Sequence, residues 1–318
     1  MEYTVINGKK VSRISLGTVQ LGLNYGIANN SGKPREEQSL EILSTALNCG
    51  ITAIDTASTY GNSEKIIGEF LQGYDGEFPF ITTKFKLKAA PDATYTQVKG
   101  ELERTLSSSL RNLKIDYVDC LLVHNPADIV AHPDSLPAAL EEVKKQGLAK
   151  VVGISIANPA DVESFTKVRG LYGAVQLPAN ILDRRLIESG DIELLDESGI
   201  NVFVRSVFFQ GVLFLDESKL CSTGLKSLVG GQLSELKDLA DAENMSVAQF
   251  ALSYIRDTKG VKSLVLGADN AYQVKENIQL FNTPSISDTT LQELKRRLRP
   301  IDILRVMQIL SVPKSNKA

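Results

Sequence analysis

Four polar side chains could together transfer a proton, and each stands at or just beyond the end of a short apolar run: Asp55, Tyr60, Lys84 and His124. A phenol has a pKa of about 10, which is too high for efficient proton exchange at neutral pH. An ammonium beside it, such as Lys84, would stabilise the phenolate, and Asp55 could hold Lys84 charged and in place. His124 could hydrogen-bond a substrate oxygen and orient it. The four residue types therefore predict a general acid/base centre.

Each of the four also has an ordinary structural interpretation. Asp55 could cap a following helix, and Tyr60 could pack in a loop. Lys84 stands in a lysine-rich stretch with Lys86 and could be a solvated charge, while His124 could be a loop histidine with its hydrogen bonds satisfied. Their occurrence together, after successive apolar runs, favours a shared site over four separate explanations.

The elements that would position these residues follow a repeating pattern of an apolar run, a turn and an amphipathic stretch. Short apolar runs without polar alternation are typical of parallel sheets that are buried on both faces. Eight such runs favour a closed (β/α)8 TIM barrel, with an open doubly wound sheet as the alternative. In a barrel the ends of successive strands meet on one face, so the four residues would converge. The runs are residues 14–16, 52–55, 79–83, 117–123, 151–154, 174–177, 201–204 and 263–266.

Helical patterns lie between the apolar runs, and two further features lie outside the eightfold repeat. Residues 3–11 predict a β-hairpin around Asn7-Gly8, a dipeptide suited to a type I′ turn, which could plug the N-terminal end of the barrel. Residues 288–298 and 301–310 predict extra C-terminal helices interrupted by Pro300. No linker divides the chain, so we expect one domain, 1–318. The helical patterns include residues 36–48, 64–71, 96–112, 137–146, 160–168 and 232–241.

Composition narrows the class of protein. The chain has 318 residues, 43% of them hydrophobic and 23% charged, and a formal net charge of −3. Its three cysteines, Cys49, Cys120 and Cys221, suggest neither a disulfide framework nor a metal site. We find no secretory signal and no apolar run of the about 20 residues that span a bilayer, so a cytoplasmic protein is expected. A pI of 5.6 argues against nucleic-acid binding.

Several segments resemble the aldo-keto reductase superfamily: GITAIDTASTYGNSEKIIGEFL, ITTKF, DYVDCLLVHNP and ALEEVKKQGLAKVVGIS. The resemblance extends from about residue 12 to about residue 277. It implies Tyr60 as the general acid/base, supported by Lys84 and Asp55, with His124 orienting the carbonyl. It also implies NADP(H) as the cofactor.

The resemblance places the cofactor across the strand ends, and no Gly-rich turn of the dinucleotide-binding type opens a helix here. It implies contacts near the nicotinamide, along the loop after the seventh strand and at a final helix start suited to an anion. The implied cofactor residues are Gly17, Thr18, Asp55, Ser155, Gln176, Arg205, Ser206, Phe208, Gly211, Leu213, Gly267, Ala268, Asp269, Asn270, Gln273, Glu276 and Asn277.

Two departures from the family pattern bear on the cofactor. Ser155 is followed by Ile156 where the family usually has asparagine, with Asn158 further on, so one amide contact could be lost or supplied differently. Asp269 stands where many members carry a neutral or basic residue near the 2′-phosphate. A carboxylate there would repel that phosphate and could bind a ribose hydroxyl, which makes NAD(H) possible. Alternatively, Asp269 faces solvent or caps the last helix.

These observations predict reversible transfer of hydride between NAD(P)H and a small aldehyde, ketone or sugar carbonyl. The alternative is a cofactor-binding regulatory or auxiliary subunit of the same fold with little turnover. A hydrolase is disfavoured because no paired carboxylates stand at the strand ends. The sequence leaves the oligomeric state and the substrate open, since loops at residues 22–33, 125–134 and 208–230 would determine the substrate.

Overall fold

The computed structural model describes residues 1–29, 31–166 and 169–311. Eight parallel strands close into a barrel in the order β10-β3-β4-β5-β6-β7-β8-β9, which confirms the predicted (β/α)8 barrel and excludes an open sheet. Each strand overlaps one of the predicted apolar runs. The strands are β3 (Ile14–Gly17), β4 (Ala53–Asp55), β5 (Phe80–Phe85), β6 (Val118–Val123), β7 (Ala149–Ser155), β8 (Ala174–Pro178), β9 (Asn201–Arg205) and β10 (Val261–Gly267).

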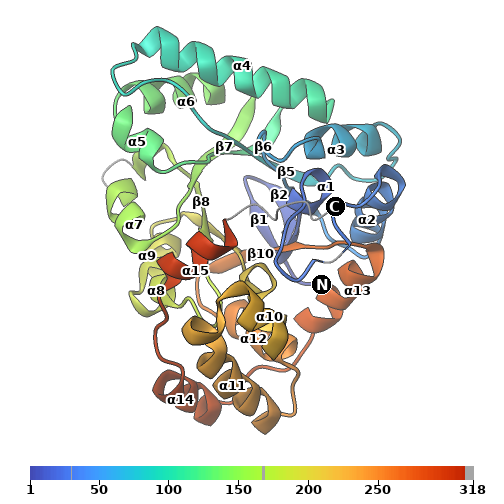
Figure 1. Cartoon of the computed structure of the whole chain (residues 1–318). Coiled ribbons are helices and arrows are strands. Elements are labelled where there is room, and N and C mark those ends of the chain that lie inside the picture. The colour runs from blue at the N-terminus through green and yellow to red at the C-terminus, as the bar shows by residue number, and fades with distance from the viewer. Residues whose placement is uncertain (30, 167–168, 312–318) are drawn as a thin grey trace.

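Helices connect the strands and surround the barrel (Figure 1). The predicted helix 232–241 is part of the longer α11, and α12 was not predicted. The last two residues of the predicted helix 160–168 lie outside the described residues. The helices are α1 (Val19–Gly22), α2 (Glu36–Asn48), α3 (Ser63–Gln72), α4 (Tyr95–Leu113), α5 (Ala127–Ala131), α6 (Ser135–Lys145), α7 (Pro159–Thr166), α8 (Arg185–Glu188), α9 (Asp191–Glu197), α10 (Glu217–Thr223), α11 (Lys226–Ala242), α12 (Val247–Arg256) and α13 (Ala271–Phe281), with short 3₁₀ segments η1 (Arg169–Leu171) and η2 (Phe209–Phe214).

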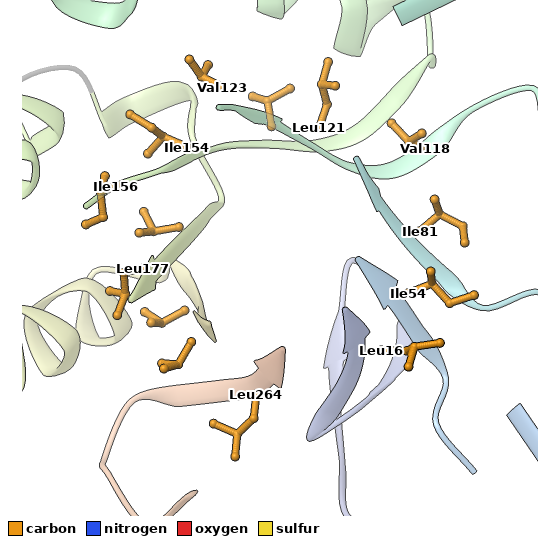
Figure 2. Close-up of a cluster of buried hydrophobic side chains, with 14 of the residues drawn as sticks. Leu16, Ile54, Ile81, Val118, Leu121, Val123, Ile154, Ile156, Leu177 and Leu264 are labelled. Atoms are coloured by element: carbon orange, nitrogen blue, oxygen red, sulfur yellow. The ribbon is translucent and has the colours of Figure 1, made fainter. Parts of the chain in front are cut away.

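The hydrophobic side chains of the strands belong to two clusters, one inside the barrel and one outside it, because successive residues of a strand point to opposite faces. In β6, Cys120 and Leu122 pack inside the barrel, whereas Leu121 and Val123 pack outside it against the helices. Figure 2 shows part of this outer cluster, with Ile54 among its labelled members. The alternation fixes which polar residues point inward at the strand ends.

The N-terminal hairpin closes the bottom of the barrel, as predicted. Strands β1 (Tyr3–Ile6) and β2 (Lys9–Ser12) pair antiparallel around Asn7 and Gly8, whose φ angles of 48° and 79° are those of a type I′ turn. Ile6 and Val11 are buried in the same cluster as Phe80, the first residue of β5. This plug leaves the opposite, C-terminal face of the barrel for a site.

The predicted C-terminal helices are present as α14 (Asp288–Arg297) and α15 (Ile303–Leu310), on either side of Pro300. Gln210 in the segment after β9 contacts Met307 in α15, with Nε2 3.9 Å from Sδ. This contact places α15 at the rim that carries the C-terminal strand ends. Within the described residues, no helix is long and apolar enough to cross a membrane.

Candidate active site

The strand period determines where three of the four predicted catalytic side chains point. Asp55 lies two residues after Ala53, and His124 lies two residues after Leu122; both Ala53 and Leu122 pack inside the barrel. Lys84 pairs in register with Leu122 on the neighbouring strand. Asp55, Lys84 and His124 therefore all point inward at the C-terminal ends of consecutive strands.

Lys84 and Asp55 form a buried ion pair. Lys84 Nζ lies 2.6 Å from Asp55 Oδ1 and donates a second hydrogen bond to the Thr56 carbonyl at 2.9 Å. The two side chains are only 1% and 5% exposed. Burial by itself lowers the pKa of Lys84, but the Asp55 carboxylate and the Tyr60 hydroxyl outweigh it and raise that pKa above its usual value. Lys84 is therefore a buried lysine paired with Asp55 and not a solvated surface lysine.

Tyr60 completes the group from the loop that follows β4. Lys84 Nζ lies 5.0 Å from the centroid of the Tyr60 ring. The Tyr60 and His124 rings meet edge to face, with centroids 5.9 Å apart and an interplanar angle of 81°. The structure thus brings all four predicted residues together at one rim of the barrel.

His124 is held in its neutral form. Burial chiefly, together with the positive charges of Lys84, Arg205 and Lys86, lowers its pKa to about 4. Its Nδ1 lies 3.3 Å from the Thr59 hydroxyl. When that hydroxyl donates to Nδ1, the proton resides on Nε2 and can be donated to a carbonyl oxygen. A neutral imidazole is therefore available as a hydrogen-bond donor across the whole physiological pH range.

A cavity of about 570 Å³ opens beside Asp55 and Tyr60. Most of the residues that the resemblance implied for the cofactor line it: Gly17, Thr18, Asp55, Gln176, Arg205, Ser206, Phe208, Gly211, Gly267, Asp269, Gln273, Glu276 and Asn277. Four others do not line it. Ser155 and Ala268 are buried, Leu213 belongs to a hydrophobic cluster, and the Asn270 side chain caps α13 by accepting a hydrogen bond from Gln273 N.

Gln176, one of the lining residues of this cavity, has an unused hydrogen-bond acceptor. Its Nε2 donates to Asp55 Oδ2 at 2.7 Å, which fixes the amide. Its Oε1 is buried and has no hydrogen-bond partner in the described structure. An unpaired buried oxygen is costly, so Gln176 fits a ligand that brings its own N–H donor, as the carboxamide of a nicotinamide does.

Asp269 lines the cavity just before the start of α13 and does not cap that helix, because Asn270 performs that function. Its carboxylate accepts a hydrogen bond from Asn29 Nδ2 at 3.1 Å. Glu276 lines the cavity nearby, whereas Lys262 pairs with Asp196 on the outside of the barrel. The part of the cavity lined by Asp269 and Glu276, the acidic arm, therefore carries two carboxylates.

Several lining residues were not found from the sequence. Tyr25 and Asn29 come from the loop after α1, Gln210 from the loop after β9, and Gln249 from α12. Their neighbours are distant in sequence: Ile27 N donates to the Gln210 carbonyl at 2.9 Å. No local sequence pattern predicts contacts between loops so far apart in the chain. The one signal was general: Tyr25, Asn29 and Gln210 lie in the loops at residues 22–33 and 208–230, which were expected to determine the substrate.

With this geometry in place, the chain can be assigned to a family. It belongs to the aldo/keto reductase family, whose sequence profile matches residues 13–298. L-glyceraldehyde 3-phosphate reductase of Escherichia coli (strain K12) is 26% identical over 320 residues, or 90% of each chain. NADH-specific methylglyoxal reductase of the same organism is 27% identical over 317 residues, covering 88% of this chain and 93% of that protein. The fold is similar to the crystal structure of an aldo-keto reductase from Klebsiella pneumoniae in complex with NADPH, with a TM-score of 0.69 and 20% sequence identity. The superposition covers 94% of this chain and 96% of that one.

Proposed function

We propose that this chain reversibly reduces the carbonyl of a small aldehyde, ketone or sugar to an alcohol, with a nicotinamide cofactor bound in the cavity. When bound, the reduced cofactor supplies a hydride. The observation that carries the proposal is the buried Lys84–Asp55 pair directly beside the Tyr60 ring, with His124 on the edge of the same ring. The L-glyceraldehyde 3-phosphate reductase and methylglyoxal reductase relatives support a small carbonyl substrate.

The chain's own residues would handle the proton. Tyr60 donates its hydroxyl proton to the carbonyl oxygen, and the positive charge of Lys84 stabilises the phenolate that remains. Asp55 keeps Lys84 in position through the 2.6 Å ion pair. His124 donates a hydrogen bond to the same oxygen and so aligns the carbonyl with Tyr60. In the oxidative direction each of these transfers runs in reverse.

The cofactor would be held along the cavity by the strand-end residues described above. Gln176 would accept a hydrogen bond from the nicotinamide carboxamide through its free Oε1. At the acidic arm, Asp269 and Glu276 would face the adenosine ribose, and Arg205 is the one cation among the described lining residues. Because a 2′-phosphate carries close to two negative charges, we propose that this arm favours NAD(H) over NADP(H).

The Tyr60→Phe variant tests the proposed acid. It should lower kcat roughly 10²–10⁴-fold while leaving cofactor affinity nearly intact, since only proton transfer is lost. The assay follows NADH and NADPH oxidation with a panel of aldehydes, ketones and keto-sugars. Tyr117→Phe is the matched control, because this half-exposed tyrosine precedes β6 at the other end of the barrel.

The alternative, an auxiliary subunit with little turnover, makes a different prediction. Such a protein would bind the cofactor tightly. With every carbonyl compound of the panel, however, the wild type would oxidise the cofactor no faster than Tyr60→Phe does. Wild-type kcat in Tyr60→Phe would instead require another general acid.

A further inference from the structure

Lys86 is the first residue beyond β5, and its side chain is directed to the mouth of the barrel. Its two neighbours, Phe85 and Leu87, are both buried in the outer hydrophobic cluster, between the barrel and the helices. Because successive residues of an extended segment point to opposite faces, Lys86 lies on the inner side, one step above the buried Lys84. Unlike Lys84, it is exposed. Its ammonium group is therefore available to a ligand that enters the mouth.

The register of the strands places Lys86 beside His124. Strands β5 and β6 pair in parallel up to Phe85 and Val123, and His124 N donates to the Phe85 carbonyl at 2.8 Å. The next pair in this register is Lys86 with His124. Each of these two follows a residue of the outer cluster, so both side chains face inward from adjacent strand ends. The charge of Lys86 is thus located next to the residue that is proposed to orient the carbonyl.

This sector of the rim is separate from the cofactor cavity. Strands β5 and β9 are four strands apart in either direction around the closed ring, so Lys86 and Arg205 stand on opposite sides of it. The described residues that line the cavity include none from β5, from β6 or from the loops that follow these two strands. A substrate held between Tyr60 and His124 would therefore have the cofactor on one side and Lys86 on the other.

The protein supplies no counter-ion for Lys86 within the described side chains. Lys84 is paired with Asp55, whereas Lys86 forms no ion pair with a described carboxylate. The acid that contacts this segment, Asp128, is already engaged: its Oδ2 accepts from Leu87 N at 3.1 Å and its Oδ1 from a neighbouring side-chain amide at 3.0 Å. A cation at the mouth of a site attracts anionic ligands and can pair with them there.

We propose that Lys86 binds an acidic group of the substrate, so that the substrate is a small carbonyl compound carrying a carboxylate or a phosphate. This rests on the proposed carbonyl reduction and narrows its substrate class. Adjacent strands are about 4.8 Å apart, so an acidic group a few bonds from the carbonyl can reach Lys86 while the carbonyl contacts His124. A lysine ammonium is a point charge with three rotatable donors, and it suits carboxylates and phosphates alike.

The test compares acidic and neutral carbonyl compounds of matched chain length. The pairs are succinic semialdehyde with butanal, for the carboxylate, and glyceraldehyde 3-phosphate with glyceraldehyde, for the phosphate. The wild type should show a higher kcat/KM for the acidic member of at least one pair, and the pair that shows it identifies the acidic group. Lys86→Gln should lower the acidic-to-neutral ratio of kcat/KM in that pair roughly three- to tenfold, as expected for a charged contact at an exposed site. The change should appear in KM, because Lys86 contacts a group that does not react.

Two variants control this measurement. Lys86→Arg should keep the preference, because it retains the charge. Lys144→Gln removes the same charge from the exposed C-terminal turn of α6, which leads to the bottom of β7, and should leave the ratio unchanged. Added salt should weaken the wild-type preference, because it screens an exposed charge.

Three outcomes would overturn the inference. One is an acidic-to-neutral ratio that is the same in wild type and Lys86→Gln. Another is a wild type that prefers the neutral member of both pairs. The third is a loss of NADH affinity in Lys86→Gln that accounts for its whole effect, since Lys86 would then act on the cofactor.

A wild type that reduces no carbonyl compound would refute the proposed function, and the inference is then tested by binding alone. Succinate and glycerol 3-phosphate are titrated calorimetrically into the NADH-loaded protein. Binding of either one by the wild type, weakened at least threefold in Lys86→Gln and unchanged in Lys144→Gln, supports the anion site. No binding, or equal binding by wild type and Lys86→Gln, overturns it.

Discussion

Asp269→Asn should change which nicotinamide cofactor the protein prefers. The substitution removes one negative charge and keeps the shape of the side chain. The carboxylate is half-buried on the cavity wall and accepts a hydrogen bond from Asn29 at 3.1 Å, so it is fixed in place. Asparagine can still accept that bond through its amide oxygen, which isolates the effect of charge.

The size of the effect follows from Coulomb's law. A unit charge on a 2′-phosphate within about 5 Å of the carboxylate would be repelled by about 1.7 kcal/mol at an effective dielectric of about 40. The phosphate carries nearly two charges, whereas salt screens a site open to solvent. A net penalty of about 1.5–3 kcal/mol corresponds to a roughly 10- to 150-fold weaker binding of NADPH. Asp269→Asn should therefore improve the Kd for NADPH by about that factor, with little gain for NADH.

The assay is fluorescence titration of both cofactors into wild type, Asp269→Asn and two controls. Asp241→Asn removes the same charge from the exposed surface of α11 and should alter neither Kd selectively. Asn29→Ala removes the hydrogen bond but keeps the carboxylate, so its effect should be similar for NADH and NADPH. A strong wild-type preference for NADPH that persists in Asp269→Asn would refute the reasoning and show that the 2′-phosphate binds away from this arm.

Two further predictions concern the catalytic group. Lys84→Met should lower the free energy of unfolding, measured by urea denaturation, by about 3–5 kcal/mol, because it leaves the buried Asp55 carboxylate without its counter-ion. The double variant with Asp55→Asn should recover part of that lost stability, because it also removes the unpaired charge. Because the pKa of His124 falls from 6.5 to about 4 on folding, the unfolded chain binds the proton more readily. Stability should therefore decline as the pH drops from about 6.5 to about 4, and His124→Gln should reduce that dependence. In an NMR titration, the His124 imidazole should protonate near pH 4; a midpoint near 6.5 would mean that it is solvated.

The barrel could be predicted from the sequence because burial on both faces leaves a local signature. Each of the eight strands overlaps a predicted apolar run, and the period of two then places Asp55, Lys84 and His124 on the inner face. The helical patterns of the sequence do not include α12, although Ser246 and Gln249 form a capping box at its start.

The shape of the cavity wall formed by the segment after β9 could not be predicted. The physical reason is the backbone conformation of that segment. Ser206, Phe209 and Gln210 have φ angles of 62°, 50° and 55°, a region that costs a non-glycine residue on the order of 1–2 kcal/mol. Residue types do not predict such a positive φ angle at non-glycine residues, because its energetic cost is offset only by contacts with residues distant in the sequence.

Those contacts come from the loop after α1, nearly two hundred residues earlier in the chain. Ile27 N donates to the Gln210 carbonyl at 2.9 Å, and a side chain at Gly211 would bring its Cβ to 2.7 Å from that of Ala28. Gly211, with a φ of 94°, is thus required both by its conformation and by the close approach of the two loops. Each loop is shaped by the other, so neither follows from its own residues. The same two loops supply Tyr25, Asn29 and Gln210 to the cavity wall, which is why the sequence predicted the proton-transfer group but not the shape of the site around it.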